Sequence, residues 1–464
     1  MHPRLYLLIV LCLSPVLALA EAAGDSVDNA DTPVNAADQL AEGQRETRRQ
    51  VASEGEDPQA QTTIERQEKA EELAGQEDEM KQDPLDGEQL EKVREAVQAE
   101  EDEPRPEREK EVEKAIFKPS LEGKIYGSIR LHYRSTDQGS IFGDAGSRLG
   151  AEGGWRTRPD AWLYARIEAG FNVLDELDQL LSPGGSSGED EQGDSVFPRL
   201  YTIGIETPGL VASIGKNWST YYRVANFTDR FDSAGSDAVG TFNASTDGGA
   251  TGTGRADGVF QSRAYMDFLP ETWNVEPFNL NVQLQSGQPI PRVEGVKYQN
   301  AIGLSTVLEL SDDFTFGIAY NFAQIEDLDN PAVQAAGIKG DAKALLFGAR
   351  WFDEQWYLAL TVARLENHET TDKGTYFLGW GSELYARYRL IKSYWLVSGY
   401  NWLSPDDGET QAGQYELLYG VVGLRYSIDD FRRLAYAEWR LDSTSSENGE
   451  ALGNIFTIGI RWDF

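Results

Sequence analysis

The sequence has very little of the two residue types that most often hold metals or form disulfides. Its 464 residues include one cysteine, Cys12, and three histidines. Cys12 lies in an N-terminal apolar run that we expect to be removed, so the processed chain would have no disulfide to stabilise it. Of the histidines only His132 and His368 would remain, and no Cys or His spacing of the zinc type is present. We therefore expect neither a metal site nor any other cofactor.

Long hydrophobic runs are also missing. After the N-terminus, no stretch reaches the roughly 20 apolar residues that a membrane helix needs. The mean hydropathy is −0.48 and the formal net charge is −35, values that resemble those of a soluble acidic protein. Membrane β-barrels give such values too, because lumen-facing polar residues alternate with lipid-facing apolar ones. The acidic charge balance leads us to expect no nucleic-acid partner.

Composition divides the chain into three parts. Residues 1–20 (MHPRLYLLIVLCLSPVLALA) have a basic start, an apolar run and a small-residue exit, which predicts a secretory signal peptide. Residues 21–120 are rich in Glu, Asp, Gln and Ala, and their one aromatic residue is Phe117. Because this region cannot bury enough apolar surface, we predict an acidic, largely disordered periplasmic extension with transient helices. A short coiled coil is the alternative, although no heptad pattern is sustained.

From residue 121 to residue 464, short alternating segments follow one another. In KIYGSIRLHYR, DAWLYARIEAGFN, DFTFGIAYNF and SELYARYRLI, apolar side chains occupy every second position, as in a strand with one apolar face. The polar faces carry arginines, glutamates and large aromatics, while the apolar faces contain Gly and Ala and end in aromatics. This pattern is typical of a lipid-facing band with aromatic girdles around a wet interior, and less so of a soluble sandwich or propeller.

The links between these segments alternate in length. ETPGL, LSDD, FDEQ and LIKS are tight, whereas AQIEDLDNPAVQAAGIKGD and DSTSSENGEALGN are long. We therefore predict an all-β fold, a transmembrane antiparallel β-barrel of about 16 strands over residues 121–464, integral to the cell outer membrane. An even number of strands would place both termini on the periplasmic side, and a barrel of this size encloses an aqueous channel.

The last segment, NIFTIGIRWDF, alternates to the final residue, with Ile460, Trp462 and Phe464 on its apolar face. Together with KIYGSIRLHYR, SRLGAEGG, YARIEAGFN and PRLYTIGIETPGLVASIGKNW, it resembles the general porins of Gram-negative outer membranes over roughly residues 121–464. The resemblance implies passive transport of ions and small hydrophilic solutes, and an assembly signal in the terminal aromatic for the barrel-assembly machinery. It also implies contact with outer-membrane lipid and lipopolysaccharide, and a homotrimer in which a second loop (here 174–194) reaches over a neighbouring subunit.

In that family the third loop folds into the lumen and sets acidic residues against basic residues of the wall. The corresponding loop here would run from about residue 216 to residue 257. The resemblance assigns its acidic side to Asp229, Asp232 and Asp237, and the facing basic wall to Arg130, Arg148, Arg199 and Arg255. Ser128 stands where the family has a further lysine. A transverse field across such a gap would order water and separate the paths of cations and anions.

Other functions stay open. A substrate-specific channel for sugars or anions is the nearest, because Tyr126, Trp162 and Tyr164 would offer stacked aromatics and an arginine row would favour phosphate. A structural barrel whose acidic extension tethers an envelope partner is a second. An outer-membrane enzyme would need a histidine near the rim, such as His368 in an expected loop, but we expect no enzyme. For a general channel, the acidic loops predict a modest preference for cations.

Overall fold

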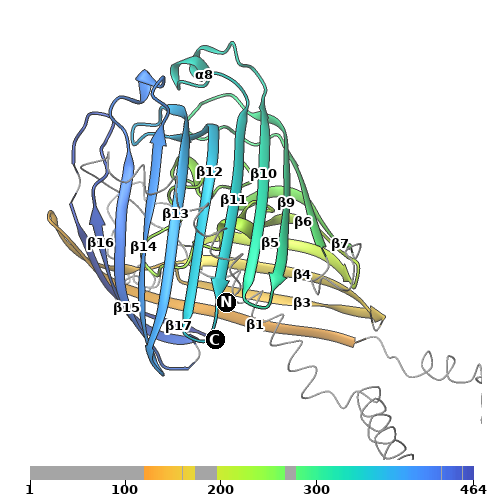
Figure 1. Ribbon diagram of the computed structural model, residues 1–464. Coiled ribbons are helices and arrows are strands. Elements are labelled where there is room, and N and C mark those ends of the chain that lie inside the picture. Colours follow the sequence, from red (N-terminus) through yellow and green to blue (C-terminus); the bar gives the residue numbers. More distant parts are fainter. Residues whose placement is uncertain (1–119, 159, 173–195, 267–277, 430, 452) are drawn as a thin grey trace, which may run out of the picture. The chain divides into compact units, whose positions relative to one another are not determined.

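The computed structural model describes residues 120–158, 160–172, 196–266, 278–429, 431–451 and 453–464 (Figure 1). The expected signal peptide, the acidic extension up to residue 119 and the expected second loop at 174–194 lie outside these residues. Among the described residues, no helix has the length and hydropathy needed to cross a bilayer.

The described residues form 17 strands of one antiparallel sheet. They are β1 (Ser120–Thr136), β2 (Gly139–Asp144), β3 (Arg148–Arg158), β4 (Ala161–Phe171), β5 (Val196–Thr207), β6 (Leu210–Trp218), β7 (Arg255–Met266), β8 (Phe278–Ser286), β9 (Tyr298–Ser311), β10 (Phe314–Ile325), β11 (Ala342–Phe352), β12 (Trp356–Thr370), β13 (Tyr376–Ile391), β14 (Tyr394–Pro405), β15 (Leu417–Ser427), β16 (Arg433–Asp442) and β17 (Ile455–Asp463). Short helices lie in the connections: α7 (Tyr222–Ala225), η1 (Asn243–Ser245), α8 (Pro331–Ala335) and η3 (Thr410–Ala412).

The sheet closes into a barrel through its first and last strands. On one side of β1, residues 128–135 pair with residues 463–456 of β17. On the other side, residues 120–128 pair with residues 156–148 of β3. Each later strand from β3 to β17 pairs with the next in the chain, including β9 with β10. The ring of 16 strands confirms the predicted barrel and leaves no open sheet edge in it.

The seventeenth strand, β2, was not predicted. The chain turns back after β1, and β2 pairs with residues 131–136 of that strand. It lies on the same edge of β1 as β3, which pairs with residues 120–128. The segment read as the second strand, SRLGAEGG, is the start of β3. The hairpin escapes a pattern search because it has only six residues and Gly139 has a φ of 150°, outside the range of ordinary strand residues.

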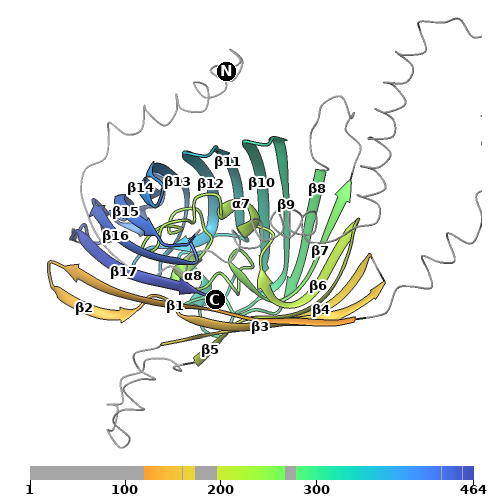
Figure 2. The ribbon, with the colours of Figure 1, turned by 90° about the horizontal axis from the view of Figure 1, so that it is seen from below.

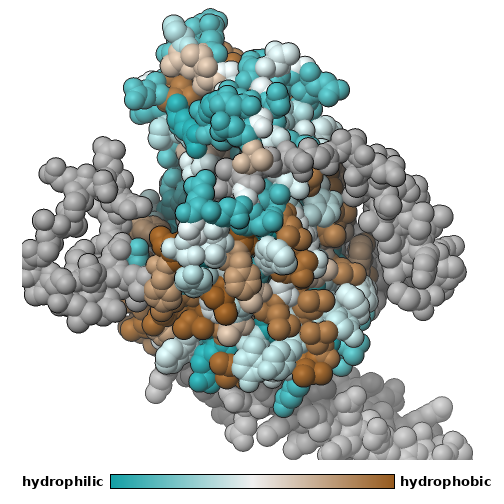
Figure 3. Space-filling model, turned by 90° about the vertical axis from the view of Figure 1, so that its left-hand side faces the viewer, coloured by the Kyte–Doolittle hydropathy of each residue, from teal (hydrophilic) through white to brown (hydrophobic). Residues whose placement is uncertain are grey.

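Alternation along the strands separates an apolar outer face from a polar inner face. The exposed large hydrophobic side chains include Ile125, Ile167, Leu358, Leu396 and Trp462, each between inward-facing neighbours. Figure 3 shows the result on one wall, where an apolar band crosses the barrel below the polar loop end. Because side chains of this kind are costly to expose to water, the band is suited to hydrocarbon.

The predicted tight links are confirmed and lie at one end of the barrel. β5 ends at Thr207 and β6 begins at Leu210, and β9–β10, β11–β12 and β13–β14 are joined by links that are equally short or nearly so. We call this the short-turn end. The longer connections, including the one that carries α8, lie at the opposite, long-loop end (Figure 1).

The chain's last residue takes part in closure. Phe464 N donates to Gly127 O and Gly127 N donates to Phe464 O, each at 3.0 Å. The Phe464 ring covers Gly127, since a β-carbon there would lie 2.5 Å from the ring's Cζ. Trp462 and Phe464 are 56% and 57% exposed on the outer face. The aromatic end therefore packs against the first strand and faces outward.

Candidate functional site

Residues 219–254, the connection between β6 and β7, fold into the barrel, and we call them the lumen segment. Their path, which includes α7, lies inside the ring of strands when the barrel is viewed along its axis (Figure 2). Tyr221, Val224, Phe227 and Phe231 are all buried there. The predicted third loop at 216–257 thus corresponds to this segment, with its ends inside β6 and β7.

Glutamates of the inner wall accept hydrogen bonds from backbone amides of the lumen segment. The acceptors are Glu369 on β12, Glu383 on β13 and Glu438 on β16, all buried. Glu438 accepts from Asp232 N at 2.9 Å and Ser233 N at 2.8 Å. The other two pairs are Ala238 N to Glu383 at 3.0 Å and Ala244 N to Glu369 at 2.9 Å. These bonds give buried amides of the lumen segment their acceptors and hold the segment against the wall.

Side-chain amides of β7 and β8 donate hydrogen bonds to backbone carbonyls of the lumen segment and of the residue before it. Gln261 donates to Trp218 O at 2.8 Å, and Gln283 donates to Gly252 O at 2.8 Å. Gln285 donates to Gly249 O at 2.7 Å. Since buried backbone groups need partners, the two kinds of wall side chain together satisfy a segment with little secondary structure of its own.

Close approach also requires glycine on the wall. A β-carbon at Gly381 would lie 1.7 Å from Ala238 O, and one at Gly348 would lie 2.7 Å from the Val224 side chain. Neither position could hold a larger residue without moving the lumen segment.

The four arginines predicted for the basic wall are inward-facing and buried, on four strands of one side of the barrel. They are Arg130 on β1, Arg148 on β3, Arg199 on β5 and Arg255 on β7. Arg199 Nε pairs with Glu168 at 2.7 Å. One guanidinium nitrogen on each of Arg130, Arg199 and Arg255 has no hydrogen-bond partner in the part of the chain that the structure describes.

The three predicted acids lie in different environments. Asp229 is only 1% exposed and accepts a hydrogen bond from the Tyr222 hydroxyl. Burial raises the pKa of the Asp229 carboxyl from 3.8 to about 6, against the opposing effect of that hydrogen bond. Asp232 forms an ion pair with Arg425.

The third acid, Asp237, accepts from the Tyr419 hydroxyl and lies 3.8 Å from Arg440. Asp232 also approaches the basic side, because one of its oxygens is 3.9 Å from Arg461. Asp229 therefore differs from the other two, which both lie beside arginines.

Several charged residues of the inner wall were not singled out from the sequence. Arg461 lies directly opposite Arg130 in the β1–β17 register, and its Nε donates to Asp463 at 2.7 Å. Ser128 donates to the same carboxylate. The alternation of NIFTIGIRWDF already puts Arg461 and Asp463 on the polar face, so closure against the first strand was the signal that could have found them.

A second group that was missed lies where the lumen segment returns to the wall. Lys216 Nζ lies 2.7 Å from Asp247 and 2.6 Å from Asp257, and Arg255 Nε lies 3.4 Å from Asp247. Burial acts to raise the pKa of Asp247, but the charges of Arg255 and Lys216 outweigh it and hold the pKa below its usual value. Asp247 therefore faces the basic wall as a carboxylate.

The histidine considered for an enzyme is not in a loop. His368 lies in β12, is fully buried, and donates from Nε2 to Gly240 O at 2.9 Å. That expectation was wrong because the strand continues through the polar run ENHET, where the wall meets the lumen segment rather than water.

No protein-family model matches the chain. No curated protein sequence matches it either. Solved structures of outer-membrane porins and channels do match. OmpF of Salmonella typhi, in a complex with daunomycin, is 18% identical over 74% of this chain and 97% of its own, with a TM-score of 0.58.

Two further structures match over a similar range. The outer-membrane channel DcaP of Acinetobacter baumannii is 12% identical over 74% of this chain and 98% of its own, with a TM-score of 0.55. An anion-selective porin from Comamonas acidovorans is 12% identical over 74% of this chain and 100% of its own, with a TM-score of 0.51. The chain therefore has the porin fold, a closed 16-stranded antiparallel β-barrel.

Proposed function

We propose that this barrel is a water-filled channel of the outer membrane, through which ions and small hydrophilic solutes diffuse passively. The lumen segment, set between the glutamate-bearing wall and the arginine wall, is the observation that carries the proposal. A segment held in the lumen by strand side chains narrows the path, and its charge sets the field across the gap.

We place the constriction between Asp232, Asp237 and Asp247 on the lumen segment and Arg130, Arg148, Arg199 and Arg255 on the wall. Asp229 is left out, because its carboxyl is buried and accepts a hydrogen bond from Tyr222 instead of lying beside an arginine of the wall. The free guanidinium nitrogens of the wall support a role for the arginines toward water and anions. The short-turn end would face the periplasm, with both termini on that side, as is usual for such barrels.

The channel proposal is tested in planar bilayers. The purified chain should give discrete conductance steps in KCl, and Gly381→Val, which displaces the lumen segment, should change their size. A wild-type protein that inserts but never conducts would leave the structural-barrel function as the better account.

A substrate-specific anion channel is the second candidate, because the basic wall carries the additional Arg461. It predicts anion-selective reversal potentials in a salt gradient, whereas the acidic loops of a general channel predict a modest cation preference that fades as salt rises.

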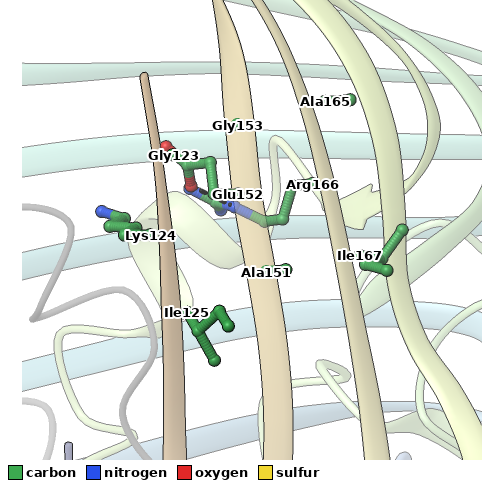
Figure 4. Close-up of a pocket in the computed structure, with 9 residues that line it drawn as sticks. All are labelled: Gly123, Lys124, Ile125, Ala151, Glu152, Gly153, Ala165, Arg166 and Ile167. Atoms are coloured by element: carbon green, nitrogen blue, oxygen red, sulfur yellow. Dashed lines mark hydrogen bonds and ion pairs between the residues drawn. The ribbon is translucent and has the colours of Figure 1, made fainter. Parts of the chain in front are cut away.

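We also propose that the barrel forms a homotrimer through the outer face of β1, β3 and β4. Figure 4 shows a shallow depression there. It is lined in part by residues with small side chains or none, namely Gly123, Ala151, Gly153 and Ala165. Ile125 and Ile167 beside it are 74% and 63% exposed, which is high for side chains of this size. A second barrel wall would cover them. Native detergent complexes with the mass of a single barrel would contradict the trimer.

Other contacts of the barrel follow from the membrane setting. Outer-membrane lipid would cover the remaining apolar band, and lipopolysaccharide would meet the long-loop end. The exposed Phe464, Trp462 and Ile460 on the last strand would serve as the signal read by the barrel-assembly machinery. Phe464→Ala should then reduce the yield of assembled barrel in cells more than it reduces the stability of the purified barrel.

A further inference from the structure

Arginines and aromatic rings alternate on the inner wall at the short-turn end, where Tyr357 donates to Phe227 O of the lumen segment at 2.9 Å. We call this group the arginine–aromatic strip: Arg350 on β11, Tyr357 on β12, Arg387 and Arg389 on β13, Trp395 on β14 and Phe431 in the turn before β16. In the sheet register, Tyr357 lies opposite Arg387 and Trp395 lies opposite Arg389. Their chain neighbours Leu358, Leu390 and Leu396 are exposed on the outer face, so the strip points inward.

The guanidinium groups of the strip lie against ring faces. Arg387 Cζ is 4.8 Å from the Trp395 ring centre, 4.9 Å from that of Phe431 and 5.6 Å from that of Tyr357. Arg389 Cζ is 5.2 Å from the Trp395 ring. Such stacking fixes the plane of a guanidinium and leaves its N–H edge for a ligand.

None of the three arginines has a carboxylate partner among the described residues. Arg199, Arg425, Arg440 and Arg461 elsewhere on the inner wall are all paired with acids. In contrast, the Nε atoms of Arg350 and Arg387 are buried and have no acceptor within the described ranges. The Arg389 side chain donates to Lys392 O at 3.2 Å. Stacking on rings explains the packing of these arginines, but it does not neutralise three positive charges.

The arginines are also within reach of a solute. Arg350, Arg387 and Arg389 are half-buried, so part of each side chain is open to solvent. An anion that reached the strip would meet fixed N–H donors beside apolar ring surface. The planar fork of arginine matches a carboxylate bidentately, and the half-buried ring of Phe431 offers area to a flat apolar body.

We propose that the arginine–aromatic strip is a binding site for small aromatic carboxylates, with the carboxylate on the edges of Arg387 and Arg389 and the ring against Phe431. This site rests on the proposed channel function, because solutes would reach it through the lumen. It would hold such anions before or after they pass the constriction and so favour them over neutral solutes of the same size.

The test is equilibrium binding of sodium benzoate to the full-length purified chain in detergent, by titration calorimetry at fixed ionic strength. Arg387→Gln should weaken benzoate binding about tenfold or more, as expected for loss of a charge-assisted hydrogen bond. Arg433→Gln is the matched control. It removes the same charge at the same end, from an exposed arginine paired with Asp429, and should leave binding unchanged. Equal benzoate affinity in the two variants would overturn the proposal.

Further titrations show whether the site recognises the carboxylate, the aromatic ring or both. Benzyl alcohol should bind far more weakly than benzoate, and Phe431→Leu should weaken benzoate binding more than binding of inorganic phosphate. Phosphate binding as tight as benzoate would contradict an aromatic site and indicate a general anion site. If Arg387→Gln does not assemble, Arg389→Gln and Arg387→Lys carry the same test, since lysine keeps the charge but loses the planar fork.

KCl conductance of the same preparations separates the two proposals. A wild-type chain that conducts but does not bind benzoate refutes the strip alone. A chain that binds benzoate but does not conduct refutes the channel and leaves the binding site standing.

Discussion

The buried carboxyl of Asp229 gives a prediction with a defined sign and size. It lies in the lumen segment, 1% exposed, and accepts a hydrogen bond from Tyr222. Asp229→Asn keeps an oxygen that can accept this bond and removes the charge that burial disfavours. We expect the variant to be more stable than the wild type at pH 8.

The magnitude follows from the pKa. Burial raises the pKa of Asp229 from 3.8 to about 6, so the folded chain holds this proton more tightly than the unfolded chain. Stability from this group is therefore fully present below pH 3.8 and is lost as pH rises through 6. A shift of roughly two units corresponds to a penalty of about 3 kcal/mol at neutral pH and above. Asp229→Asn should recover most of that amount at pH 8 and very little at pH 4.

The assay is unfolding of the purified barrel in detergent, followed at pH 4 and pH 8. Asp247→Asn is the contrasting variant, because the charges of Arg255 and Lys216 hold the pKa of Asp247 below its usual value. It should destabilise the barrel at pH 8, and the loss should shrink as pH falls through the folded-state pKa of Asp247. An Asp229→Asn variant that is no more stable than the wild type at pH 8 would refute this reasoning.

Three further predictions concern the lumen and the N-terminal region. Gly381→Val should push the lumen segment off the wall at Ala238 and make it more sensitive to protease, whereas Gly420→Val, with only ordinary contact at 3.8 Å, should not; equal sensitivity would contradict the close approach. Arg148→Ser should shift the reversal potential in a KCl gradient toward cations, and an unchanged potential would remove Arg148 from the constriction. A variant that lacks residues 21–117 should still assemble and conduct, and its failure to do so would make this region part of the barrel's function.

The barrel could be predicted from the sequence because the patterns that specify its strands and turns each lie within a few neighbouring residues. Alternation within each strand shows which side chains face out, and turns such as LSDD and LIKS show where strands end. The inward direction of Arg130 and Arg148 followed from the same alternation. These features need only a few neighbouring residues, and the structure confirms the fold that they predicted.

The path of the lumen segment could not be predicted, because its partners are far away in the chain. Thr228 bonds to Glu383 across 155 residues, and Asp232 N bonds to Glu438 across 206 residues. The segment itself is rich in Gly, Ser and Asp and has no period that would show which side chains are buried. Asp229 illustrates the consequence: its type suggested a charged lumen residue, and its position made it a buried one. His368 was misplaced for the same reason.

Ionic current through the purified chain in a planar bilayer tests the central claim most directly. The account predicts discrete conductance steps in KCl whose reversal potential in a salt gradient changes when Arg148 is replaced by serine. A correctly assembled barrel that inserts into the bilayer and passes no current would contradict the claim that this porin fold is a channel.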